Sequence, residues 1–394
     1  AWQLRPYGPY GHPPAGIAAA IYAVTVSEPY MLIPLNAALH ATAGVALMRI
    51  ARYLTGDDVA AMCAALPFVL FPSAMMWYAQ IHKDGFYFAG AFLCLYGWIL
   101  LARLPTWQSD WRPVLAGLAW LGVGVALMGL VRTYSFQVMQ GIGFIFATGL
   151  TVLFIVRGAK KNLPWKTCVA AIAILLLVPL LLRFAPVDLN LSYNVPEASS
   201  TTGLTAGGHR LDEMSAKDHR RVSGWLPRVI EKNFLWLAGQ REGYIIREPG
   251  MQQNQKAGSM IDGEVRLSSV ADFIAYLPRA AQIGFLAPFP IHWIAQGASP
   301  GGSLMRRLVG AETIVVYCAL LFLPYALWLW RRKVEMWLPV VFGTVLVLVY
   351  AFSTPNLGSL YRLRYGFLML LVGVAIAGCL NALKRRASRQ ADKQ

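Results

Sequence analysis

The chain alternates long apolar runs with short polar turns, and a single long polar stretch interrupts this pattern. An apolar run of about 18–25 residues is long enough to cross a bilayer core of about 30 Å as an α-helix. We predict nine such spans, at residues 30–50, 58–80, 84–103, 113–131, 134–156, 167–185, 308–330, 335–353 and 361–383. The pattern indicates an all-α polytopic membrane protein.

The polar stretch divides the chain into three regions. Residues 1–185 form an N-terminal membrane region, in which an interfacial helix within 13–29 precedes six spans. Residues 186–307 form one long external loop, and residues 308–394 form a C-terminal membrane region with three spans and a basic tail. The opening residues, "AWQLRPYGPYGHPP", do not resemble the start of a protein, so we expect the natural chain to continue upstream.

Two segments of the loop have apolar residues at helical spacing, at 223–245 and 268–285. We expect amphipathic helices that lie against the external ends of the spans. The second should start at a cap formed by Ser268 or Ser269, with Asp272 in its first turn. Its apolar length approaches that of a span, but Arg279 would then lie in mid-membrane, which is costly.

Composition agrees with a membrane protein. Hydrophobic residues make up 57% of the chain and charged residues only 14%, against about 25% in soluble domains. The net charge of +16 comes from Lys and Arg, most of which lie in short loops between spans. This is the distribution that the positive-inside rule describes, so we predict a lipid bilayer and no nucleic acid as the partner of these cations.

The same rule predicts the orientation. If nine spans alternate, the basic segments all fall on one side, which we assign to the cytoplasm: Arg49 with Arg52, Arg103 with Arg112, 157–166, 331–333 and 384–386. The other side is external. It holds residues 1–29, the turn at Lys83 and Asp84, the turn at Arg132, the long loop and the turn before Arg362. We predict a multi-pass protein of a bacterial inner membrane.

The stretch "QIHKDGFYFAGAFLCLYGW" places Lys83 and Asp84 at the external mouth of a span. As the first residue of its helix, Asp84 is stabilised by the helix dipole, so a helix cap would explain it. A polar site at the outer surface would explain it as well. We take Asp84 and His12 as the candidate catalytic residues, and we expect Lys83 to extend to the lipid headgroups.

Arginines on the external side are candidates for binding a carrier phosphate, because guanidinium grips phosphate with two hydrogen bonds. They are Arg132, Arg362 and Arg364. The last two point about 200° apart on a helix, so at most one faces a given cavity. Anchoring to lipid headgroups is the alternative. In the long loop, the candidate substrate-binding residues are Arg241, Glu242, Asp262 and Arg279.

Several chemistries lack their sequence patterns. The chain has no P-loop, dinucleotide-binding glycine pattern, HExxH or GxSxG motif. The five cysteines fall in apolar runs, where we expect small core residues, and the pattern predicts neither a disulfide nor a zinc site. Intramembrane acids are sparse, with Glu312 near the end of its predicted span, which disfavours an ion-coupled transporter.

Three segments carry a resemblance to a known class. "GHPPAGIAAAIY" resembles the His-Pro-Pro segment of GT-C membrane glycosyltransferases, which include protein mannosyltransferases and aminoarabinose lipid A transferases. "FPSAMMWYAQIHKDGFYFAGAFLCLYGWIL" is similar to their second external turn, in which an Asp opens the next span. "YRLRYGFLMLL" resembles the late arginine-bearing span of bacterial polysaccharide-assembly proteins.

The resemblance implies a donor and a reaction. Members of the class transfer a sugar from a polyprenyl-phosphate carrier on the external face. His12 and Pro13 match the His-Pro-Pro segment, and Asp84 matches the Asp that helps to hold acceptor or metal, so a divalent metal stays open as a cofactor. The catalytic carboxylate of the class lies in the first external loop, where this chain has only Glu28 within residues 1–29.

Other functions stay open at this point. An O-antigen or exopolysaccharide polymerase or ligase would also use arginines on external loops. A non-catalytic component of polysaccharide export, or a transporter, would use the same membrane architecture. The sequence favours the glycosyltransferase because cations for a lipid phosphate and carboxylates for an acceptor hydroxyl lie on the same predicted side.

Overall fold

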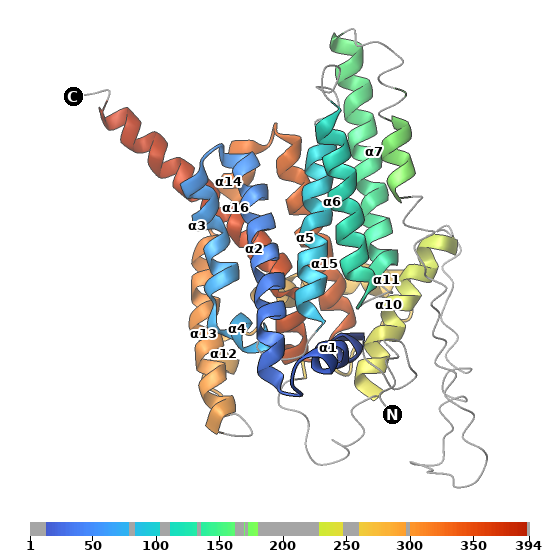
Figure 1. Cartoon of the computed structure of the whole chain (residues 1–394), viewed down its shortest axis with the longest axis vertical. Helices are drawn as coiled ribbons and strands as arrows, with labels where there is room; N and C mark the ends of the chain where they lie inside the picture. Colours follow the sequence, from blue (N-terminus) through green and yellow to red (C-terminus); the bar gives the residue numbers. More distant parts are fainter. Residues whose placement is uncertain are drawn as a thin grey trace. The chain divides into compact units, whose positions relative to one another are not determined.

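The protein is all-helical in the part of the chain that the computed structural model describes (Figure 1). That part comprises residues 13–78, 83–102, 111–131, 135–161, 169, 172–179, 228–246, 260–296 and 300–391. The helices are α1 (Pro13–Val24), α2 (Ile33–Thr55), α3 (Asp58–Leu70), α4 (Pro72–Tyr78), α5 (Asp84–Leu101), α6 (Arg112–Gly129), α7 (Ser135–Lys161), α10 (Arg228–Ile246), α11 (Val270–Leu286), α12 (Pro290–Trp293), α13 (Pro300–Leu320), α14 (Leu323–Trp330), α15 (Val334–Ser353) and α16 (Leu357–Ala391), with the 3₁₀ turn η1 (Pro29–Leu32) before α2.

Seven helical segments of the described chain are long and apolar enough to cross a membrane, which supports a multi-pass membrane protein. They are Pro29–Thr55, Asp84–Leu101, Arg112–Gly129, Val138–Val156, Gly301–Trp330, Val334–Ser353 and Leu357–Ser388. Each coincides with one of the nine predicted spans. The predicted helix within 13–29 is also present, as α1.

The remaining two predicted spans fare differently. The segment predicted as one helix at 58–80 is two helices, α3 and α4, which are separated at Phe71. Of the segment 167–185, residue 169 and residues 172–179 are helical and the rest lies outside the described residues. The span predicted at 308–330 begins earlier, at Gly301, so Glu312 lies well inside it rather than near its end. Cys318, expected in the core, is exposed.

Local sequence accounts for the helix ends. Gly56 ends α2 in the left-handed conformation (φ 70°), and the Asp57 side chain then accepts a 3.0 Å hydrogen bond from the Ala60 amide to cap α3. The predicted cap of α11 is Ser269 rather than Ser268, and Ser269 and Asp272 form a capping box. Phe71 is extended because it precedes Pro72, which disfavours helical geometry.

The chain folds into two compact units. Unit 1 contains Ala1–Leu189, Pro290–Val345 and Tyr365–Gln394. Unit 2 contains Asn190–Phe289 and Leu346–Arg364, so the helices of the long loop fold together with the end of α15 and the start of α16. The predicted helix at 268–285 is confirmed as α11, and the one at 223–245 is confirmed as α10 from Arg228 onward, because residues 223–227 lie outside the described residues.

Unit 1 has a tightly packed centre in which α5 is buried along nearly its whole length. Glycines allow the backbones of α5 and α6 to approach closely. A Cβ atom added at Gly124 would lie 2.5 Å from the Gly90 carbonyl oxygen, and one at Gly97 would lie 2.6 Å from that of Gly117. Of the two glycines in the α6 sequence GVG, Gly124 lies at the contact with α5, whereas a Cβ atom at Gly122 would meet open space.

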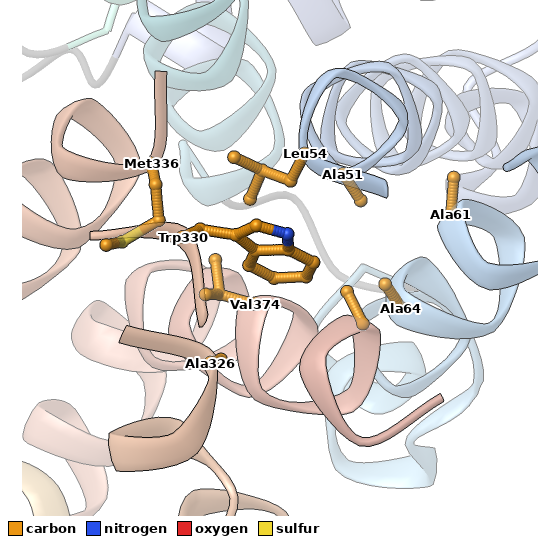
Figure 2. Close-up of a cluster of buried hydrophobic side chains, with 9 residues drawn as sticks. Ala51, Leu54, Ala61, Ala64, Ala326, Trp330, Met336 and Val374 are labelled. Carbon is orange, nitrogen blue, oxygen red and sulfur yellow. The ribbon is translucent and has the colours of Figure 1, made fainter. Parts of the chain in front are cut away.

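One end of unit 1 gathers three basic segments. Lys333, before α15, donates a 2.8 Å hydrogen bond to the Leu54 carbonyl, and Lys384 of α16 forms an ion pair with Asp57. Beneath them, the indole of Trp330 packs among apolar residues of α2, α3, α15 and α16 (Figure 2). The three segments are Arg49 with Arg52, 331–333 and 384–386, and the expectation that they share one side is met. Their assignment to the cytoplasm stays a prediction.

Unit 2 is built around α11. Phe273 lies between Phe234 of α10 and Phe352 of α15. Its ring centroid is 5.1 Å from each of theirs, and the rings are inclined to one another. A Cβ at Gly284 would lie 2.9 Å from a Val347 methyl carbon, so this face of α11 lies directly against α15. An amphipathic helix of the long loop therefore packs against the end of α15, a candidate span.

The α5–α6 contact predicts different effects for two neighbouring glycines. Gly124→Ala should lower the free energy of unfolding by about 1–3 kcal/mol, because the added methyl group has no room. The control Gly122→Ala, on the same helix, should be neutral or stabilise by up to about 1 kcal/mol through helix propensity. Thermal unfolding of the two variants in detergent compares them, and equal effects would contradict close packing at Gly124.

Candidate functional site

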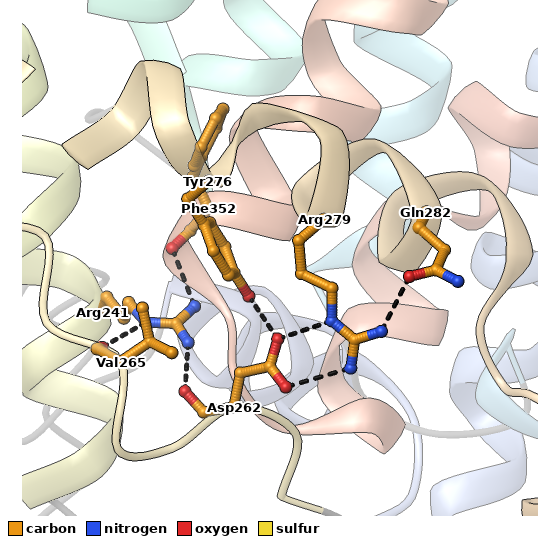
Figure 3. A network of polar contacts seen from close by, with 7 residues as sticks. All are labelled: Arg241, Asp262, Val265, Tyr276, Arg279, Gln282 and Phe352. Atoms are coloured by element: carbon orange, nitrogen blue, oxygen red, sulfur yellow. Dashed lines mark hydrogen bonds and ion pairs between the residues drawn. The ribbon is translucent and has the colours of Figure 1, made fainter. Parts of the chain in front are cut away.

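Three charged residues of the long loop, Arg241, Asp262 and Arg279, belong to a network of polar contacts in unit 2 (Figure 3). Arg241 lies on α10 and is 2% exposed. Its guanidinium donates to three main-chain carbonyls, those of Val265 at 3.2 Å, Phe352 at 3.3 Å and Asp262 at 2.5 Å. A single side chain thus ties the segment before α11 to α10 and to the end of α15.

Asp262 is the centre of the network. Its carboxylate accepts two hydrogen bonds from Arg279, at 2.9 and 3.1 Å, and one from the Tyr276 hydroxyl at 3.0 Å. Its backbone is left-handed (φ 49°), a conformation that Asp tolerates better than most residues. Arg279 is also held from its other side, because it donates to the Gln282 side chain at 2.7 Å.

The network sets the charges of its members. The hydrogen bond from Arg279 lowers the pKa of Asp262, although burial acts in the opposite direction. The same contact raises the pKa of Arg279. Burial raises the pKa of Tyr276 to about 12. Asp262 is therefore a firmly ionised carboxylate, which makes it a poor general base but a good acceptor that can orient a hydroxyl group.

The network is partly open to solvent. The side chain of Arg279 is 40% exposed and that of Asp262 is 18% exposed, whereas Arg241 is inaccessible. Within this group, Arg279 and Asp262 can therefore meet a ligand directly, and Arg241 acts through the segment that it holds. Glu242, next to Arg241 on α10, is half-buried.

Arg364 lies on α16, and its fully buried side chain reaches the end of α11. Its guanidinium donates to the carbonyls of Ile283 (2.8 Å), Gly284 and Ala287, which lie in or just after the last turn of that helix. A cation is favourable there because the last carbonyls of a helix lack partners and the helix dipole is negative. In this arrangement Arg364 stabilises α11, and its predicted contact with a carrier phosphate stays a prediction. Arg362, two residues earlier, is half-buried.

Asp84 belongs to unit 1. It is the first residue of α5, as predicted, and it is only 4% exposed. Lys83 before it is half-buried. The described candidate arginines, Glu242 and Asp262 all belong to unit 2, so the structure defines Asp84 and that group separately. His12 and Arg132 lie outside the described residues.

Sequence reasoning identified Arg241, Asp262 and Arg279 but missed Tyr276 and Gln282. A signal for both was present, because Tyr276, Arg279 and Gln282 recur every three residues and so lie along one side of α11. No signal in the sequence paired Asp262 with them, since that contact depends on the fold of the segment before α11.

The described residues contain no group of three or more His, Cys, Asp or Glu side chains placed to hold a metal ion. Comparison of the chain with protein-family models, with curated proteins and with solved structures gave no match.

The lowered pKa of Asp262 predicts a pH-dependent contribution to stability. A group whose pKa is lower in the folded state stabilises the fold above its unfolded pKa of about 3.9 and loses that effect as the pH falls through the folded value. Wild type should therefore exceed Asp262→Asn in free energy of unfolding by about 1–3 kcal/mol at pH 7, with the difference shrinking below about pH 4.

Chemical unfolding in detergent between pH 3 and 7 measures this difference. The control is Glu264→Gln, an exposed carboxylate two residues away, which should stay close to wild type at every pH. An Asp262→Asn deficit that does not change with pH would rule out the charge as its source.

Proposed function

We propose that this protein is a membrane glycosyltransferase of GT-C type. It takes a sugar from a polyprenyl-phosphate carrier on the external face and serves the assembly of a cell-envelope polysaccharide or glycoconjugate. The observation that carries the proposal is Asp84, a carboxylate buried at the first residue of an apolar span. A carboxylate at a helix start is favoured by the helix dipole, and the burial of α5 gives this one a defined place in the first turn of the span.

In this proposal Asp84 acts on the acceptor, either as a general base toward its hydroxyl group or by holding it in place. His12 belongs to the same site. Arg132 and Arg362 supply positive charge for the carrier phosphate, and Arg364 contributes by holding the end of α11. Arg279 and Asp262 bind hydroxyl groups of the substrate, because they are the accessible members of their network. The resemblance of the segments around His12 and Asp84 to the GT-C class supports these roles.

A transporter is the second candidate, and one observation favours it. Glu312 is buried within a span that begins at Gly301, and it contacts a broken helix. Intramembrane acids at discontinuous helices are typical of secondary transporters. A polymerase, a ligase or a non-catalytic export component has no such separate support in the structure.

The external site requires the orientation predicted from the basic segments. We expect a membrane-impermeant thiol reagent to label Glu264→Cys in intact cells and to label Arg386→Cys only after permeabilisation. Both positions are exposed, and the test uses a chain whose native cysteines are replaced. The reverse labelling pattern would place Glu264 on the cytoplasmic side and Arg386 on the external side, which contradicts a reaction on the external face.

The role of Asp84 is separable from helix capping. Lys83 is the N-cap of α5 and makes no side-chain cap hydrogen bond, so Asp84→Asn should cost the helix start only its charge–dipole interaction, about 0.3–1 kcal/mol. The variant should abolish restoration of the missing envelope glycan in a deletion strain while the protein level is unchanged. The matched control is Asp58→Asn, an exposed carboxylate at the first residue of α3, which should restore the glycan fully.

Carrier binding is a separate readout. Native mass spectrometry should detect undecaprenyl phosphate on the wild-type chain and on Asp84→Asn alike, because the phosphate is assigned to the arginines. Full glycan restoration by Asp84→Asn would remove Asp84 from the site. Failure of the wild-type chain to bind undecaprenyl phosphate in preference to phosphatidic acid would count against the glycosyltransferase itself.

A further inference from the structure

The break between α3 and α4 disrupts the main-chain hydrogen bonds of a segment that was predicted to cross the membrane. In a continuous helix, the amide of each residue donates to the carbonyl four residues earlier. Pro72 has no amide proton, so the Phe68 carbonyl loses its donor. Phe71 is extended, and the Ser73 amide no longer donates to the Val69 carbonyl.

Side chains from three other helices take over these main-chain groups. The Glu312 carboxylate of α13 accepts the Ser73 amide at 2.9 Å. The His40 ring of α2 lies 3.1 Å from the Val69 carbonyl, and the Tyr365 hydroxyl of α16 donates to the Phe68 carbonyl at 2.9 Å. All of these residues belong to unit 1.

The side chains that make these hydrogen bonds are buried. Glu312 is 5% exposed and Tyr365 is 2% exposed, and neither site is open to water that could replace the bond. A buried main-chain amide or carbonyl without a partner is strongly disfavoured, most of all inside a bilayer. The break is therefore a feature that three helices are built to hold, rather than a local loss of helix.

The break lies close to Asp84 along the chain. The helix after it, α4, ends at Tyr78, and only residues 79–83 separate that end from Asp84. The six residue steps from Tyr78 to Asp84 reach about 20–22 Å at full extension, so the place where α4 ends limits where α5 can begin.

We propose that Glu312 is a positioning residue for Asp84. Its carboxylate replaces the missing carbonyl as acceptor for the Ser73 amide and holds the start of α4, and a fixed α4 restricts where the chain can enter α5 at Asp84. The last step rests on the proposed function of Asp84, whereas the hold on α4 does not. The role needs an acceptor oxygen at residue 312, and it does not need a negative charge.

Hydrogen exchange by mass spectrometry on the full chain in detergent tests the hold on α4. Glu312→Ala should raise the exchange rate of the amides of residues 73–76 by about 10-fold, because the Ser73 amide loses its acceptor. Glu312→Gln should keep wild-type exchange because its side-chain oxygen can still accept. Ser73→Ala is the matched control and should also match wild type, since it keeps the amide; within the described residues, the buried Ser73 hydroxyl has no hydrogen-bond partner.

Two exchange results would overturn the proposal. Wild-type exchange in Glu312→Ala would show that the carboxylate does not hold α4. Equally fast exchange in Glu312→Gln and Glu312→Ala would show that the charge matters rather than the acceptor, which would favour the transporter and an ion or proton site at Glu312.

Glycan restoration in the deletion strain tests the link to Asp84. We expect Glu312→Gln to restore the glycan and Glu312→Ala to fail at an unchanged protein level. Loosened α4 with full restoration by Glu312→Ala would overturn the positioning of Asp84. Failure of the glycosyltransferase proposal has a different signature, because Asp84→Asn would then restore the glycan while the exchange results stand.

Discussion

Main-chain carbonyls and amides that are buried, in protein as in a bilayer, have no water to bond, so the protein must supply a partner for them. Continuous helices meet this requirement internally, and the difficulty arises where a helix breaks or ends. At the α3–α4 break, His40, Glu312 and Tyr365 take the role of the missing helical bonds. In unit 2, Arg364 does the same at the end of α11, and Arg241 does so for the segment before α11.

This requirement changes how the charged residues are interpreted. The sequence made Arg364 a candidate for phosphate binding and Arg241 a candidate for substrate binding, but both guanidinium groups donate to main-chain carbonyls of the protein itself. Arg279 and Asp262 differ, because part of each side chain is accessible and their bonds run between side chains. The charged side chains best placed to bind a ligand are therefore those that are accessible and do not serve as hydrogen-bond partners of the backbone.

The packing of unit 1 gives Asp84 its environment. Because α5 and α6 approach through glycines, α5 is enclosed along its length, and its first residue is buried as well. A carboxylate at that position is held by the packing of the helix that it begins. The helix before it is in turn held by Glu312 of α13.

Much of the helical architecture follows from sequence, because apolar runs of membrane-crossing length and local capping residues act over short distances. The seven long apolar helices, the capping box at Ser269 and the start of α5 at Asp84 are all predicted in this way.

Tertiary structure alone decided which residues meet across long separations. The carboxylate of Glu312 and the amide of Ser73 are 239 residues apart in the chain, and Asp262 meets Arg279 only because the segment before α11 turns at a left-handed residue. Pro67 and Pro72 suggest irregularity in the second predicted span, but its division into two helices depends on partners that only the packing of α2, α13 and α16 provides. Periodicity predicts the faces of helices, while the partners of main-chain groups at breaks and ends are set by the packed fold.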